Sequence, residues 1–399
     1  MRPTSAVWLL ALALGAALLF VLTLASGRST DRREIRTTLS LADALGAGDT
    51  TGYARAFEPR PFVFPADHGE HPDFATEWWY FTGNLETSDG RRFGYQLTFF
   101  RRALAPGTEI RASAWATRQA WMAHFAVTNV SASRFLAFER FSRGALQLAG
   151  ATVSPFRVWL EDWSLEGDSA RAFPVRIRAA EENTAIDLVI EPGKPIVPQG
   201  NRGLSRKGPE AGNASYYYSM TRMPTTGSIT FEGERHVVNG SSWLDREWST
   251  SALRSGLAGW DWFALQFDDN TELMLYRLRR DDGVTDPFSG GTFIGADGST
   301  TAFNAEDITI EETRSWSSSL DGTRYPSEWT LRIAPLALTI DIEPLVSDQE
   351  LNLAVRYWEG AVTGRATRGA ETRTAIGYVE LTGYAGPPSS RAFPDGRSN

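Results

Sequence analysis

The chain has 399 residues, of which 42% are hydrophobic and 12% aromatic, so it can fill the cores of two or three domains. Its formal net charge of −8 offers no basic surface for a phosphate backbone, and nucleic acid is not an expected partner. There is no cysteine, which excludes a disulfide framework, thiolate metal sites and a cysteine nucleophile.

The N-terminus has the pattern of an export signal. Ala6 to Ala25 is a run of twenty residues without a charge, followed by a polar segment. Thr23-Leu24-Ala25 supplies a small-x-small cleavage site, but the length equally suits a helical signal anchor. We expect residues 1–28 to be a signal peptide or anchor, and the protein to be exported: periplasmic, membrane-anchored or secreted. We predict that residues 29–60 form a linker with a short helix.

From Pro61 onward the sequence alternates between apolar and polar residues with a period of two. Short runs of this kind end in Gly, Pro, Asp or Asn, as antiparallel strands do. The pattern predicts an all-β sandwich or barrel architecture. The runs that show it are Phe93–Phe100, Thr184–Pro192, Glu272–Arg280, Asp307–Thr313, Leu336–Pro344 and Gly377–Tyr384.

Two similar segments predict two similar domains. Thr76–Arg102 and Trp260–Arg280 share an acid, tryptophans and aromatics, a polar turn, an apolar strand and an arginine pair, which indicates an internal duplication. The Pro- and Gly-rich stretch Lys194–Ser215 reads as the connection, and we place the boundary after Met223. The predicted domains are therefore 61–223 and 224–388, with a flexible tail at 389–399.

Several motifs together resemble one family. They are HPDFATEWWYFTGNL, AHFAVTNV, YYYSMTRMPTTGSITFEG, SSWLDREWS, GWDWFALQF with ELMLYRLR, and YWEGAV with GYVELTGY. In these motifs the chain, from about Phe62 to Tyr384, is similar to AttH-like proteins, also called predicted secreted hydrolases, and to carotenoid 1,2-hydratases and fungal decalin-forming cyclases. The resemblance implies two tandem lipocalin-like antiparallel β-barrels, which suit an apolar isoprenoid, polyketide or lipid ligand. It also suggests, by association, an ABC-type exporter as a partner.

The stretch NGSSWLDREWST, Asn239 to Thr250, concentrates charge and tryptophan. On a strand, Trp243, Asp245 and Glu247 point to one face, and Leu244, Arg246 and Trp248 point to the other. If the acidic set faces an enclosed space, burial and mutual repulsion raise one carboxyl pKa, and a protonated acid results. Such an acid donates a proton to an alkene or a carbonyl oxygen. Asp245 and Glu247 are therefore the candidate catalytic residues.

A structural role for this cluster remains equally open. An ion pair of Arg246 with Asp261, or of Glu247 with Arg277 or Arg279, would make the motif a clasp between the domains. In the families that the chain resembles, carotenoid 1,2-hydratases carry a histidine close to the position of Arg246, whereas an arginine at this position matches the predicted secreted hydrolases.

Other aromatic and polar residues are candidates for ligand contact, although the acid-tryptophan corners could equally plug the barrels, and a lone strand histidine is commonly structural. The predicted ligand-binding residues are Glu77, Trp78, Trp79, Tyr80, His124, Trp243, Arg246, Trp248, Asp261, Trp262, Tyr276 and Trp358.

Other site classes find no support in the sequence. Asp67 to Asp73, DHGEHPD, holds two histidines and three carboxylates, but it is a loop with no tetrahedral ligand spacing, and we expect no metal. The sequence contains no GxSxG elbow and no P-loop, so a serine hydrolase is disfavoured and no cofactor is expected.

Two hypotheses follow. The chain is either an exported enzyme that hydrates, hydrolyses or cyclises an apolar molecule, or a non-catalytic carrier of such a molecule beside the membrane. If Asp245 and Glu247 line an apolar site without a basic partner, the enzyme is favoured, whereas pairing of each with arginine favours the carrier.

Overall fold

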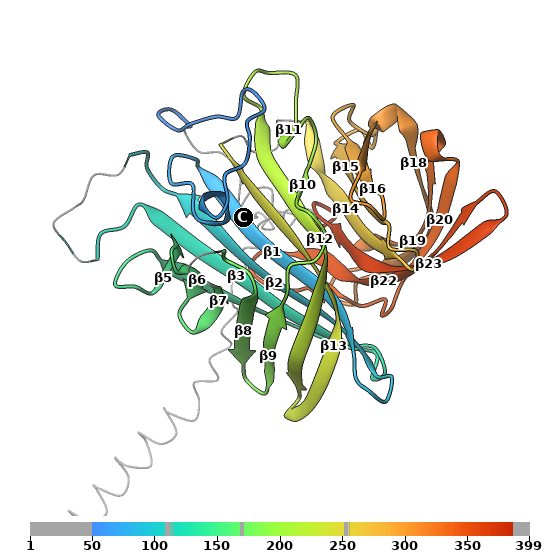
Figure 1. The fold of residues 1–399 in the computed structure, drawn as a ribbon, viewed down its shortest axis with the longest axis horizontal. Helices are drawn as coiled ribbons and strands as arrows, with labels where there is room; N and C mark the ends of the chain where they lie inside the picture. Colours follow the sequence, from blue (N-terminus) through green and yellow to red (C-terminus); the bar gives the residue numbers. More distant parts are fainter. Residues whose placement is uncertain are drawn as a thin grey trace, which may run out of the picture. The chain divides into compact units, whose positions relative to one another are not determined.

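The computed structural model describes residues 50–107, 113, 115–167, 171–250, 254 and 256–385. These residues form two antiparallel sheets and three short 3₁₀ turns, η1 (Ala66–His68), η2 (Ala305–Asp307) and η3 (Ala334–Leu336) (Figure 1). The all-β prediction with two barrel-like sheets is confirmed. No helix in the described ranges is long and apolar enough to cross a membrane. The predicted signal helix, the linker helix and the tail from residue 389 lie outside these ranges.

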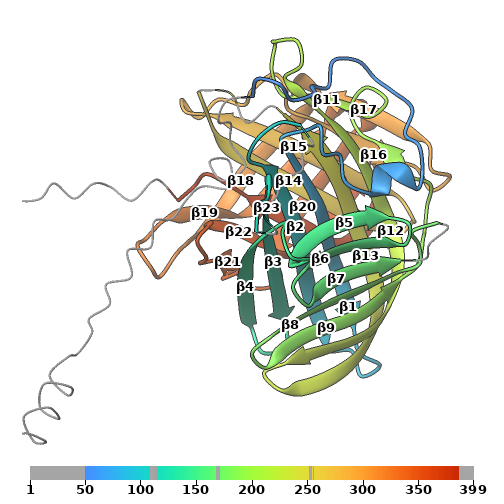
Figure 2. The same ribbon diagram turned by 90° about the vertical axis from the view of Figure 1, so that its left-hand side faces the viewer.

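The first sheet has the order β4-β3-β2-β1-β13-β12-β9-β8-β7-β6-β5, with β10 and β11 paired to β12. Strands β5 to β9 curl back over β1 to β3, so both groups line one interior (Figure 2). Its strands are β1 (Thr76–Glu86), β2 (Arg92–Ala103), β3 (Gln119–Asn129), β4 (Arg134–Arg143), β5 (Ala149–Val153), β6 (Phe156–Leu160), β7 (Trp163–Gly167), β8 (Val175–Glu181), β9 (Thr184–Ile190), β10 (Val197–Pro198), β11 (Leu204–Arg206), β12 (Ala214–Phe231) and β13 (Glu234–Ser249).

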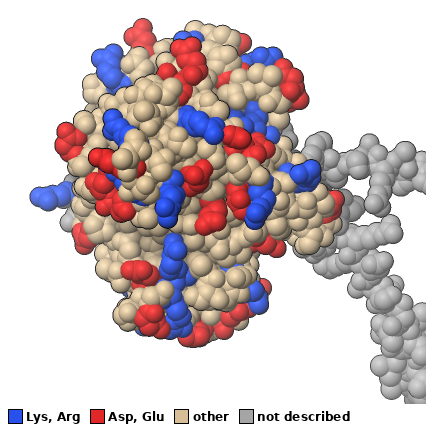
Figure 3. All heavy atoms as spheres, turned by 90° about the vertical axis from the view of Figure 1, so that its right-hand side faces the viewer, with Lys and Arg blue, Asp and Glu red and all other residues tan. Residues whose placement is uncertain are grey.

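The second sheet has the order β17-β16-β15-β14-β23-β22-β20-β19-β18, with β21 paired to β22. On the side of the molecule shown in Figure 3, acidic and basic side chains are interspersed. The strands of the second sheet are β14 (Leu257–Phe267), β15 (Glu272–Arg280), β16 (Gly290–Ile294), β17 (Thr300–Asn304), β18 (Ile308–Ser317), β19 (Arg324–Ile333), β20 (Leu338–Pro344), β21 (Glu350–Leu351), β22 (Tyr357–Arg368) and β23 (Glu371–Leu381).

The two sheets share one topology. Each begins with four strands in a meander, and the first strand of each meander, β1 or β14, then pairs with the last strand of its sheet, β13 or β23. The two segments that are similar in sequence form the β1–β2 and β14–β15 hairpins. This equivalence supports the internal duplication.

The chain passes from one sheet to the other later than the sequence suggested. Met223 lies within β12, which pairs with β13 along most of its length, and both strands belong to the first sheet. The Pro- and Gly-rich stretch contains β10 and β11, which pair with β12. The connection between the sheets runs from Ser249 to Leu257, because the long β12–β13 hairpin closes the first sheet against β1.

Side chains fill the interior of each barrel. Trp79, Trp121 and Trp163 are buried in the first, and Trp329 and Trp358 in the second. The outer faces of the two sheets pack together in a third cluster of aromatic residues. Tryptophan side chains therefore occupy the barrel interiors, where an apolar ligand was expected. The candidate acidic residues lie where the two sheets meet.

Candidate active site between the two sheets

The two faces of β13 are assigned by packing. Leu244 joins the interior of the first barrel, and Trp243 joins the cluster between the sheets. Because side chains alternate along a strand, Arg246 faces the barrel interior with Leu244, while Asp245 and Glu247 face the second sheet with Trp243. The acidic set thus faces the junction between the barrels and not a lumen.

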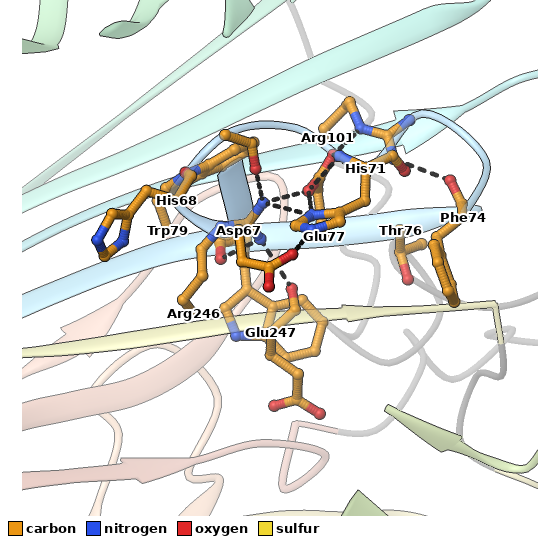
Figure 4. Close-up of polar contacts among 12 residues, drawn as sticks. Asp67, His68, His71, Phe74, Thr76, Glu77, Trp79, Arg101, Arg246 and Glu247 are labelled. Carbon is orange, nitrogen blue, oxygen red and sulfur yellow. Dashed lines mark hydrogen bonds and ion pairs between the residues drawn. The ribbon is translucent and has the colours of Figure 1, made fainter. Parts of the chain in front are cut away.

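The inner face of β13 carries a buried ion-pair network. Arg101 of β2 and Arg246 both donate to the carboxylate of Glu77, whose side chain is fully buried (Figure 4). Burial alone raises the pKa of Glu77, but the two guanidinium charges outweigh it and hold the pKa well below its usual range. The guanidinium carbon of Arg246 also lies 3.9 Å from the centroid of the Trp79 ring. Glu77 is therefore a fixed anion that stabilises the fold.

The segment before β1 covers this network. His71 stacks on Trp248 with 3.7 Å between ring centroids, and its backbone N–H donates to Glu77. Asp67 accepts hydrogen bonds from Arg60 and from the backbone of Val63. The histidine-rich loop therefore closes the end of the barrel. The described residues include no group of three or more His, Asp or Glu side chains suited to bind a metal.

The second barrel repeats this arrangement. Asp261 of β14 occupies the position of Glu77 in the duplicated hairpin, and it pairs with Arg277 and Arg279 of β15. The predicted clasp pairs are therefore wrong: Asp261 and Arg246 each find their partners inside their own barrel. The strand register explains this, because Arg277 lies directly opposite Asp261 within the second sheet.

Asp245 has a different environment on the outer face. Its carboxylate accepts hydrogen bonds from the Tyr217 hydroxyl, from Ser219 Oγ at 2.5 Å and from Trp243 Nε1 at 2.7 Å. Among the ion pairs of the described residues, none involves Asp245. Burial raises the pKa of Asp245 to about 7, against the three hydrogen bonds that lower it, and Glu247 adds to the increase. Asp245 can therefore exchange a proton near neutral pH.

Glu247 is the other candidate acid, and it has a cationic partner. Lys207, from the loop after β11, lies 3.4 Å from Glu247, and its ammonium also sits 4.4 Å from the Tyr276 ring centroid. Burial lowers the pKa of Lys207, but the negative charge of Glu247 outweighs this effect and raises it overall. Glu247 is thus a paired carboxylate, and Asp245 is the better candidate for proton transfer.

The second sheet contributes two more carboxyl groups to this junction. Glu359 of β22 lies directly opposite Glu380 of β23, and both side chains are buried. Burial raises the pKa of Glu359 to about 8 and that of Glu380 well above its usual range. Both oxygens of Glu359 and Oε1 of Glu380 have no hydrogen-bond partner among the residues that the structure describes. The cost of burying such groups unpaired makes them the least satisfied acids at the junction.

His124 lies beside these acids on β3. Its Nδ1 is 2.7 Å from the Tyr357 hydroxyl, and its Nε2 has no hydrogen-bond partner within the described ranges. Burial lowers the pKa of His124 to about 3, so the imidazole is neutral. The ring therefore orients Tyr357 without supplying a charge.

The predicted site residues fall into three places. Glu77, Trp79, Arg246 and Trp248 lie at the first barrel's interior, and Asp261 and Trp358 in the second. The predicted residues that gather at the junction are Trp78, Tyr80, His124, Trp243, Asp245, Glu247, Trp262 and Tyr276. The sequence analysis missed the junction residues Lys207, Tyr217, Ser219, Tyr357, Glu359, Tyr378 and Glu380.

A small crevice opens between the sheets beside Trp243, whose indole N–H donates to Asp245, with space for on the order of one water molecule. Four strands line it, β1 and β13 from the first sheet and β14 and β23 from the second. Its lining residues are Thr82, Gly83, Asn84, Ser241, Trp243, Ala264, Gln266, Gly377 and Tyr378.

Comparison with known proteins places this fold. A family model described as AttH-like matches residues 55–384. The chain belongs to the AttH-like family. A crystal structure of a protein assigned as AttH from Nitrosomonas europaea is 34% identical, with a TM-score of 0.75, over 83% of this chain and all of that one. The resemblance seen in the sequence motifs is thus confirmed.

The AttH-like chain is also similar to a hydratase. Kievitone hydratase from Fusarium solani subsp. phaseoli is 24% identical over 214 residues, 52% of this chain and 59% of that protein. The match thus spans about three-fifths of that relative's length. The crystal structure of kievitone hydratase from Nectria haematococca shares the fold, with a TM-score of 0.64 at 15% identity, over 83% of this chain and 96% of that one.

Proposed function

We propose that this protein is an acid–base enzyme that adds water to an apolar small molecule bearing an alkene, or cyclises it, at the junction of the two barrels. One observation carries the proposal: Asp245 is buried, no cation pairs with it among the described residues, and this burial raises its pKa to about 7. A group of this kind is both a competent acid and a competent base at neutral pH. The similarity to kievitone hydratase supports the hydration of an alkene over the other reactions.

The surroundings of Asp245 suit an apolar substrate. Tyr80, Trp243 and Trp262 pack around the carboxyl groups, and the Tyr80 and Trp262 rings meet edge to face at 5.1 Å. Aromatic walls exclude water and stabilise positive charge that develops on carbon. The crevice has room for on the order of one water molecule, so the two sheets must move apart to admit a substrate. We also propose that the protein acts after export, which the uncharged run from Ala6 to Ala25 supports.

The test is turnover in isotopically labelled water. The full chain is incubated with a panel of prenylated phenols and linear isoprenoid alkenes in ¹⁸O-water, and products are analysed by mass spectrometry. We expect one substrate class to gain a labelled water, and Asp245→Asn to lower the rate by about 10²–10⁴-fold. Asp341→Asn, at an exposed position of β20 where the carboxylate accepts a hydrogen bond from Thr330, is the matched control and should keep full activity.

The carrier hypothesis predicts a different outcome of the same experiment. A lipophilic molecule retained in native mass spectrometry, without any change of mass over time, would favour a carrier and count against the enzyme. The predicted ABC-type exporter would then be the partner to seek by co-purification.

A further inference from the structure

We infer that Glu359 is the proton donor of the reaction at this junction, that Asp245 is the proton acceptor, and that Tyr80 connects them. This inference rests on the proposed function, and it adds to that function a catalytic carboxyl from the second barrel. It also reverses the role that the sequence suggested for Asp245.

The hydrogen bonds around the two carboxyl groups differ in kind. Asp245 accepts from three donors, Tyr217, Ser219 and Trp243, and an ionised carboxylate is the form that accepts without donating. In the described part of the chain both oxygens of Glu359 lack a hydrogen-bond partner, although the residue is only 2% exposed. A charge without donors is costly at such a site, so Glu359 remains protonated.

The neighbours of Glu359 strengthen this difference. Glu380 lies opposite it on β23, and burial and the charge of Glu359 raise the pKa of Glu380, so this neighbour offers no positive charge to an ionised Glu359. The hydroxyls of Tyr80 and Tyr357 lie near enough to oppose the increase in the pKa of Glu359, but neither meets hydrogen-bond geometry with it. His124 faces this group through Tyr357 and is neutral.

The groups that face Asp245 act differently. Glu247 raises its pKa, but the ammonium of Lys207 pairs with Glu247 at 3.4 Å and offsets part of that charge. Tyr217 also receives a hydrogen bond from Trp262 Nε1 at 3.2 Å, which fixes the phenol as a donor to Asp245. Asp245 consequently loses its proton at a lower pH than Glu359.

Tyr80 lies between the two acids. It is the direct cross-strand partner of Asp245 on β1, and its buried hydroxyl has no hydrogen-bond partner in the part of the chain that the structure describes. Burial first, and then the charges of Glu359, Glu380 and Asp245, raise the pKa of Tyr80 well above its usual range. The neutral phenol can therefore accept a proton from one side while donating its own to the other.

The reaction balances with these groups alone. The O–H bond of Glu359 breaks as its proton bonds to one alkene carbon, and the π electron pair forms the new C–H bond. A water oxygen bonds to the resulting cationic carbon, and one water proton passes to the carboxylate of Asp245. Tyr80 then donates its proton to Glu359 and takes one from Asp245, which restores both groups. The net change is alkene plus water to alcohol.

Infrared titration of the full chain tests the division of roles without a substrate. At about pH 7.5, between the two carboxyl pKa values, we expect a protonated-carboxyl band in the wild type. Glu359→Gln should reduce the band by more than Asp245→Asn does, the exposed control Glu343→Gln should leave it, and a part that belongs to Glu380 should persist in all three. Any other pattern overturns the assignment, including loss of the band in Asp245→Asn. Circular dichroism checks that each variant is folded. If Glu359→Gln unfolds, Glu359→Asp replaces it in the test; this variant keeps a carboxyl group and should retain the band.

The pH–rate profile on a substrate found by the labelling experiment gives a second test. Activity should rise as Asp245 ionises near pH 7 and fall as Glu359 ionises near pH 8. Asp245→Asn should lose the rise, Glu359→Gln should lose the fall, and each should lower kcat by about 10²–10⁴-fold. Loss of the opposite limbs overturns the assignment. If no alkene reacts, the proposed function fails, while the infrared pattern still decides which group holds the proton.

Discussion

The two faces of β13 treat buried charge in opposite ways. On the inner face, Arg246 and Arg101 neutralise Glu77, and the pKa of this carboxyl is lowered. On the outer face, Asp245 is held by neutral donors, and its pKa is raised to about 7. Both acids are almost fully buried, so burial alone does not decide the outcome. The difference is the presence of arginine: paired acids hold the barrel together, and unpaired acids are available for proton transfer.

Breaking the inner pair should have the largest effect on stability. Glu77→Gln leaves two buried guanidinium groups without a counter-charge, and we expect a loss of about 3–5 kcal/mol in the free energy of unfolding. Urea denaturation followed by tryptophan fluorescence measures it. The exposed control Asp341→Asn should change the free energy by less than about 0.5 kcal/mol. A Glu77→Gln variant as stable as this control would show that the network is not structural.

The outer face should show the opposite pH dependence. The folded-state pKa of Asp245 is about 7 against an ordinary value of 3.8, so the folded state binds this proton more tightly than the unfolded state. Its contribution is complete below about pH 4 and is lost as the pH rises through 7, at up to about 1.4 kcal/mol per pH unit. Asp245→Asn cannot ionise, so its stability relative to wild type should increase across that window.

Urea denaturation of both proteins between pH 4 and 8 measures this difference. Glu77 has the reverse sign, because its lowered pKa stabilises the fold above its ordinary value and this stability is lost in acid. A stability difference between Asp245→Asn and wild type that stays constant with pH would contradict the assigned environment of Asp245.

The sequence predicted the two faces of β13 but not which one is internal. Period-two alternation separates Asp245 from Arg246 without any knowledge of the fold. Which set faces the core depends on Glu77 of β1 and Arg101 of β2. These strands are distant from β13 in sequence, and the Glu77 carboxylate stabilises the buried Arg246. The clasp pairs failed for the same reason, since Arg277 has its partner Asp261 directly opposite in its own hairpin.

Glu359 and Glu380 were missed although their motifs were recognised. Each is a single acid within an apolar strand, YWEGAV or GYVELTGY, and such an acid is a signal of function when it is buried. Sequence alone does not reveal that both face Asp245 across a junction of two sheets. The boundary at Met223 was misplaced because the Pro- and Gly-rich stretch does not connect the two sheets: it contains β10 and β11, which pair with β12 of the first sheet.

Gly94 of β2 allows a test of how closely the two sheets pack against each other at the junction. A Cβ on Gly94 of β2 would lie 2.6 Å from the Tyr378 hydroxyl and 2.7 Å from Cβ of Ala361. Gly94→Ala should therefore push the sheets apart and cost about 1–3 kcal/mol. Ala361→Gly removes one of the two contacts, so the double variant should recover part of this loss in a double-mutant cycle. Strict additivity would mean that the two sheets are not in contact here.

The smallest loss of stability should come from changing the ion pairs that Glu272 makes across the two sheets. Glu272, at the start of β15, is fully buried and accepts from Lys194 Nζ at 2.9 Å and from Arg222 Nε at 2.5 Å. Lys194 follows β9 and Arg222 lies in β12, so both cations come from the first sheet. Lys194→Gln leaves Arg222 in place and should cost about 1–2 kcal/mol by urea denaturation.

Glu272→Gln unpairs both cations and should cost more than Lys194→Gln. Equal losses in the two variants would indicate that Arg222 contributes nothing. If this pair and not the Asp245 region fastens the sheets, neither variant should shift the pH–rate profile, because both leave every group around Asp245 and Glu359 unchanged. The junction would then be held together by a clasp separate from its chemistry, which leaves the acids at its centre free to exchange protons.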